Sequence, residues 1–81
     1  MEWKMNLDDI VQYINEDSIR GELARELAGI ISDYHAGSIT VEDKELLVRE
    51  VLNSFQAQNL AEDEIMLRWA VSAATLVASI V

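Results

Sequence analysis

The chain has 81 residues, of which 15 are Asp or Glu and 6 are Lys or Arg, so its formal net charge is −9. This length allows one domain over residues 1–81, and the absence of cysteine excludes disulfides and thiolate metal sites. The negative charge opposes direct binding to nucleic acid or anionic lipid, whereas the apolar content of 51% excludes a disordered acidic tail.

The chain begins with a short arm followed by a short helix. Residues 1–6 contain no apolar run behind basic residues, so we expect no secretory signal there and a cytoplasmic protein. Apolar residues at spacings of three and four predict a helix near 7–15. Asn6 is placed to cap it, because its side-chain carbonyl can accept from a free N–H of the first turn.

A longer apolar stripe predicts the second helix, near 18–35. Asp17 or Ser18 is the expected cap. Gly21 and Gly29 lie inside this helix, where each glycine costs about 1 kcal/mol relative to alanine. Close packing against another backbone would explain why glycine is kept at both positions.

The third helix is predicted near 41–57 and follows a tight turn. Gly37 is placed to end the second helix in a left-handed conformation. Thr40 is the expected cap of the third helix, and Asp43 takes the acidic position of a capping box. The turn also resembles the second half of an EF-hand loop. That register would put Tyr34 and Ala36 where calcium needs oxygen ligands, so we expect no calcium site.

The last helix is predicted near 61–81 and is apolar around most of its circumference. Its polar side chains beyond residue 65 form one narrow stripe of Arg68, Ser72, Thr75 and Ser79. A helix of this kind is central in a core, packs against a partner, or lies in lipid. The third alternative is disfavoured, because residues 69–81 span only about 20 Å against about 30 Å of hydrocarbon.

Ala70, Ala74 and Ala78 are spaced four residues apart and form an alanine ridge on this helix. Such a ridge of small side chains lets a second helix approach closely. We therefore predict a partner interface here, with Arg68 on its polar edge. The predicted interface residues are Leu67, Arg68, Ala70, Ala74, Val77, Ala78 and Val81.

These patterns together predict an all-α fold, a small four-helix bundle with a short first helix and a long apolar C-terminal helix. Short turns favour antiparallel neighbours. No segment alternates with the period of two that a strand requires.

No residue pattern indicates an enzyme, a cofactor or a metal site. His35 is the only histidine, and with no cysteine it has no second ligand of the usual kind. The helical hydroxyls, such as Ser72 and Thr75, have no neighbouring base and are expected to bond back to the preceding turn. We therefore predict no catalytic residues and no cofactor.

The acidity could indicate a protein that imitates DNA and blocks a DNA-binding partner. However, nine acids fall at predicted helix starts, where they offset helix dipoles: Asp8, Asp9, Glu16, Asp17, Glu42, Asp43, Glu62, Asp63 and Glu64. The remaining six equal the basic residues in number. Among them, Glu22, Glu26 and Asp33 approach a row of acids, but Arg25 interrupts it in the sequence.

We therefore expect a non-enzymatic helical interaction or assembly module, which docks on a protein or self-associates through its last helix. The alternatives are an acidic DNA mimic and a protein with a C-terminal membrane anchor. The pattern of helix, Gly37 and Ile-Thr-Val-Glu-Asp-Lys before another helix looks like small bacterial and phage accessory proteins. That resemblance implies an accessory role and carries no site residue.

Overall fold

The computed structural model describes residues 6–59 and 64–80. Over these residues the chain forms helices and turns and contains no strand, so the predicted all-α class is confirmed. The helices are α1 (Leu7–Val11), α2 (Ile19–His35), α3 (Val41–Asn59) and α4 (Glu64–Ser79).

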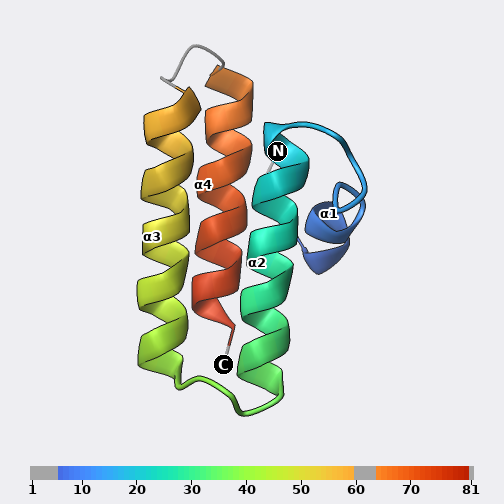
Figure 1. Ribbon diagram of the computed structural model, residues 1–81. Coiled ribbons are helices and arrows are strands. Elements are labelled where there is room, and N and C mark those ends of the chain that lie inside the picture. Colours follow the sequence, from blue (N-terminus) through green and yellow to red (C-terminus); the bar gives the residue numbers. More distant parts are fainter. Residues whose placement is uncertain (1–5, 60–63, 81) are drawn as a thin grey trace, which may run out of the picture.

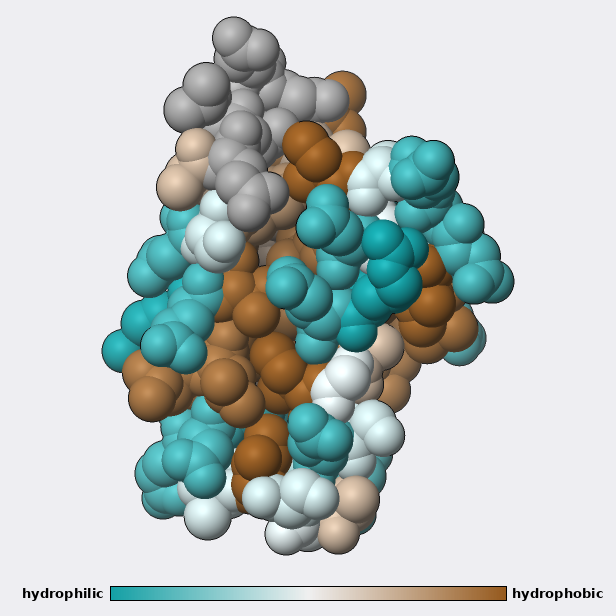
Figure 2. All heavy atoms as spheres, in the orientation of Figure 1, coloured by the Kyte–Doolittle hydropathy of each residue, from teal (hydrophilic) through white to brown (hydrophobic). Residues whose placement is uncertain are grey.

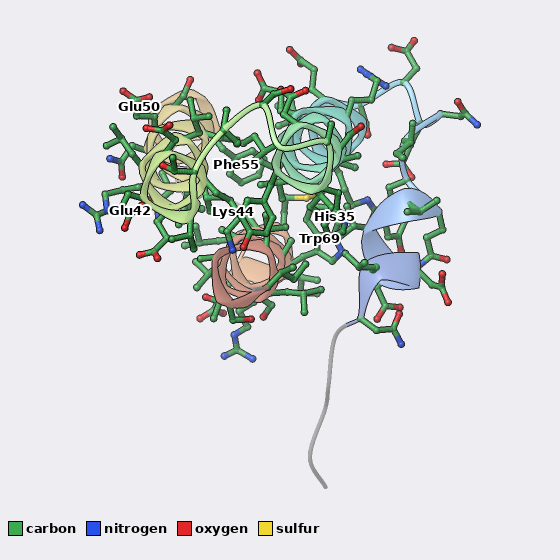
Figure 3. The ribbon with its side chains drawn as sticks, turned by 90° about the horizontal axis from the view of Figure 1, so that it is seen from below. His35, Glu42, Lys44, Glu50, Phe55 and Trp69 are labelled. Carbon is green, nitrogen blue, oxygen red and sulfur yellow. The ribbon has the colours of Figure 1, made fainter. Side chains whose placement is uncertain are left out.

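The three long helices pack as a bundle, with α1 attached to one side. Figure 1 shows α3 running antiparallel to both α2 and α4, so that α2 and α4 run parallel to each other. Viewed along the bundle, α2, α3 and α4 occupy the corners of a triangle (Figure 3), and α1 lies outside α2. The two pairs of long helices that are consecutive in the chain, α2 with α3 and α3 with α4, are antiparallel, as predicted.

The predicted capping residues begin α1 and α3. The Asn6 side chain accepts from the backbone N–H groups of Asp8 and Asp9, and the Asp9 carboxylate accepts from Asn6 N at 2.9 Å. At α3, Asp43 N donates to Thr40 Oγ1 at 3.1 Å and Thr40 N donates to the Asp43 carboxylate at 3.3 Å. Both helices therefore start with a reciprocal capping box built on aspartate.

The ends of α2 also follow the sequence. Of the two expected caps, Ser18 is the one used, and its Oγ accepts from Gly21 N at 3.1 Å. Beyond the other end, Gly37 has a φ of 80°, in the left-handed region that favours glycine.

The first helix is shorter than predicted and ends at Val11 rather than near residue 15. The chain then reaches α2 through a series of turns. Their hydrogen bonds include one from Glu16 N to Tyr13 O at 3.0 Å. Gly21 permits this, because a Cβ built there would lie 1.8 Å from Glu16 O. The close-packing explanation is correct for Gly21 and wrong for Gly29, where a Cβ would meet nothing within 4 Å.

The core lies where the three long helices meet. Phe55 lies between α3 and α2 (Figure 3), and α4 contributes small side chains that let the other helices approach closely. The buried apolar residues are Ile10, Leu23, Ala24, Leu27, Ile30, Val48, Phe55, Ala70, Ala73, Ala74 and Val77.

Aromatic and cationic contacts hold residues 10–16 onto the bundle. Ile10 is buried, and Tyr13 packs edge-on against Trp69 of α4 with ring centroids 5.5 Å apart. Arg20 lies over the Tyr13 ring at 3.9 Å, an arrangement that favours a cation. Arg25 Nη1 donates to Ile14 O at 2.7 Å. Both arginines of α2 therefore point toward the segment before it.

The side chain of Glu16 is also held in place in this part of the structure. Its carboxylate accepts from Arg20 Nε at 3.1 Å, from Arg20 Nη2 at 3.0 Å and from Ser18 Oγ at 2.6 Å. The hydrogen bonds from Arg20, with a smaller contribution from Ser18, hold the pKa of Glu16 below its ordinary value. The ionised form is thus favoured by folding.

We expect Glu16→Gln to lower stability at neutral pH and to flatten its decline in acid. A depressed folded pKa contributes stability above the unfolded pKa, about 4.3, and that contribution is lost as pH falls through the folded pKa. Urea titrations from pH 7 to pH 3 should show the two proteins converging at low pH. Glu45→Gln, at an exposed position of α3, is the control. A difference from wild type that is the same at both pH values would contradict the assignment.

Candidate functional site

The predicted interface on α4 is divided between the core and the surface. Ala70 and Val77 are fully buried and Ala74 is 3% exposed, so these three pack within the chain rather than facing outward. Leu67 and Ala78 are half-buried, and Arg68 is exposed. Val81 lies outside the described residues. The alanine ridge therefore faces α2 and α3 of the same chain, and these are the helices that pack closely against it.

The outward side of α4 is the predicted polar stripe with apolar residues beside it. We call this surface the α4 outer face and define it as Glu64, Ile65, Arg68, Val71, Ser72, Thr75 and Ser79. Ile65 is 82% exposed and Val71 is 40% exposed. A shallow open groove along it is lined by Leu67 and Val71 together with polar neighbours.

The charges on the α4 outer face cancel. Arg68 lies 3.8 Å from the Glu64 carboxylate, four residues earlier on the helix, and both side chains are exposed. An exposed pair of this kind adds little stability. Its effect is to leave this face without net charge on a chain of net charge −9.

One hydroxyl of this face is bonded back to its own helix. Ser79 Oγ donates to Leu76 O at 2.8 Å, the back-bond expected of a helical serine. His35 is exposed and lines an open groove with Leu7 of α1 and with Leu76 and Ile80 at the end of α4. Within residues 6–59 and 64–80, no three His, Asp or Glu side chains are grouped as a metal site would require.

The α2–α3 side of the bundle has the opposite electrostatic character. Glu22 and Glu26 line a groove between these helices together with Ser54 of α3. Helical spacing puts Asp33 on the same face of α2, and Asp43 and Glu50 on the face of α3 that carries Ser54. We call the set the acidic face and define it as Glu22, Glu26, Asp33, Asp43 and Glu50, all exposed.

The cations of the described chain point away from this acidic face. Arg20 and Arg25 bond toward the segment before α2, and Arg68 lies on α4. Arg49 lines a groove between α3 and α4, and Lys44 is directed into the bundle (Figure 3). Arg25 therefore does not interrupt the row of acids on α2, contrary to the expectation from its place in the sequence.

Lys44 is a structural residue that sequence reasoning missed. It is fully buried, and its Nζ donates to the carbonyl oxygens of Val77 at 2.9 Å, Ala78 at 3.0 Å and Ile80. Its ammonium also lies 4.9 Å from the ring centroid of Tyr34. At the end of α4, Val77 O also accepts from Ile80 N at 3.3 Å, and Lys44 adds a side-chain donor from α3 to the last carbonyls of that helix.

A signal for this role was present in the apolar stripe of α3. Lys44 stands four residues before the buried Val48 and seven before the half-buried Val51. That register puts it on the core face of the helix. A lysine there has to find acceptors inside the fold.

Comparison of the chain with protein-family models, with curated proteins and with solved structures finds no match. Among residues 6–59 and 64–80, no helix has the length and apolar character needed to cross a membrane. The α4 outer face and the acidic face are therefore the features of the described chain that bear on its function.

Proposed function

We propose that this chain is a non-enzymatic helical interaction module of the cytoplasm that self-associates through the α4 outer face. One observation carries the proposal: Ile65, at 82% exposure, and Val71, at 40%, are both exposed on α4, the helix whose outward charges cancel. Apolar side chains exposed in this way are stabilised when a partner removes them from water.

The charge distribution supports a second copy as the partner. Two chains of net charge −9 repel each other, and the repulsion is smallest where the meeting surfaces carry no net charge. Each α4 outer face would bring one Glu64 and one Arg68, which can also pair between copies. A second copy would further help a chain of this length, whose own core is marginal.

We expect Val71→Glu to weaken self-association by at least about tenfold, because the new carboxylate would be desolvated without a partner cation. Glutamate is a good helix former, so α4 should remain helical. Sedimentation equilibrium over a range of concentrations measures the effect. Leu46→Glu is the matched control, since Leu46 of α3 is also exposed, at 52%, and lies away from α4.

Two results would contradict this function. A wild-type chain that sediments as a monomer at every concentration would remove self-association. An equal effect of Leu46→Glu would show that added negative charge, and not the α4 outer face, governs assembly.

DNA mimicry is a second candidate, favoured by one observation. Arg25 bonds to the carbonyls of Ile14 and Glu16, which leaves Glu22, Glu26 and Asp33 as an uninterrupted acidic row on α2. A DNA mimic should compete with duplex DNA for a basic DNA-binding protein, and the competition should weaken as salt rises. Failure to displace DNA at low salt would exclude it.

A further inference from the structure

We propose that the acidic face and the apolar groove between α2 and α3 bind a basic amphipathic helix of another protein. This surface lies on the opposite side of the bundle from the α4 outer face (Figure 3). The inference therefore goes beyond self-association and can fail or succeed independently of it.

The floor of this surface is apolar. Figure 2 shows a hydrophobic band between α2 and α3, with hydrophilic side chains along both edges. At one end, Ile19 is 41% exposed and shares a small groove with the buried Leu23 and Phe55 and with the polar Glu22, Glu26 and Ser54. Leu47 and Val51, both half-buried, continue the floor along α3 by helical spacing.

The rim of this surface is negative on both sides. Glu22, Glu26 and Asp33 line the α2 edge, and Asp43 and Glu50 line the α3 edge. The five described Lys and Arg side chains lie elsewhere. Arg20 and Arg25 bond toward the segment before α2, Arg49 and Arg68 lie at or on α4, and Lys44 is buried. An apolar floor between two acidic edges is complementary to a helix with apolar residues on one face and Lys or Arg on both flanks.

The same charges exclude the other occupants of such a groove. A second copy of the chain brings a net charge of −9 and no described face with surplus cations. Nucleic acid is a polyanion and is repelled for the same reason. A helix fits better than an extended peptide, because the hydrophobic band runs between two helices (Figure 2), of which α2 has 17 residues and is about 25 Å long.

The test uses the full chain and a synthetic helical peptide of about 18 residues, which matches the length of α2. The peptide carries Leu at helical spacings of three and four, with Lys on both flanks. Calorimetric titration at low salt should show one peptide per chain. Glu22→Gln with Glu26→Gln should weaken binding about tenfold, whereas Glu42→Gln with Glu45→Gln, an equal change in net charge, should have little effect.

A second peptide with Ser in place of each Leu distinguishes the groove from simple charge attraction. We expect its binding to be lost, because it keeps the cations and lacks the apolar contacts. Equal binding of both peptides, equal loss in the two double variants, or no binding of the Leu peptide would each overturn the proposal. Val71→Glu should leave peptide binding unchanged, which separates this surface from the α4 outer face.

Discussion

Lys44→Met is expected to lower the free energy of unfolding by about 2–4 kcal/mol, because it removes the charge-assisted hydrogen bonds that a buried ammonium makes. Methionine has nearly the volume of the lysine stem, so the loss reports the ammonium group rather than a cavity. The lost hydrogen bonds are those from Lys44 Nζ to the carbonyls of Val77, Ala78 and Ile80. Urea denaturation followed by circular dichroism measures the change.

Arg49→Met on the same helix is the control, since Arg49 is exposed, and its effect should stay within about 0.5 kcal/mol. The loss at Lys44 is a large part of the total, because a domain of this length is stable by about 4–12 kcal/mol. Amide hydrogen exchange should show the last turn of α4 losing protection first. Unchanged or increased stability of Lys44→Met would show that desolvating the ammonium costs more than its hydrogen bonds return.

Gly21→Ala and Gly29→Ala are expected to act in opposite directions although both lie inside α2. At Gly21 a Cβ would lie 1.8 Å from Glu16 O. The backbone of residues 13–16 would have to move, at a cost of about 1–3 kcal/mol from overpacking. At Gly29 a Cβ meets nothing, so alanine should stabilise the protein by about 1 kcal/mol through helix propensity.

Thermal and urea unfolding of the two variants test this pair, each serving as the control for the other. Gly21→Ala should also weaken the contact of Tyr13 with Trp69, because the same segment carries Tyr13. Loss of protection from hydrogen exchange in α1 would report that change. Two variants that shift stability in the same direction would contradict the close approach at Gly21.

The helix boundaries were predictable because they depend on neighbours in the chain. Asn6, Ser18 and Thr40 each bond a backbone N–H within three residues. Gly37 ends its helix through its own dihedral angle. The end of α1 was not predictable in this way, since the chain leaves the helix at Val11 to reach Gly21, a contact between segments.

The candidate site was predictable only in part. The sequence identified α4 as the unusual helix and grouped its polar residues correctly into one stripe. It could not decide which of the apolar faces turns inward, because helical periodicity places residues on faces without saying what each face meets. The alanine face is the one that turns inward, so Ala70 and Ala74 are buried within this chain.

The sequence by itself determined that the chain is helical, where most helices begin, and that its acids gather near those starts, because each of these depends on local hydrogen bonds and periodicity. The tertiary structure decided three further features. It buried Lys44 against the end of α4, turned Arg20 and Arg25 away from the acids of α2, and turned Ala70 and Ala74 of α4 inward. Each depends on which segments meet in space, and that is set by packing among all the helices at once.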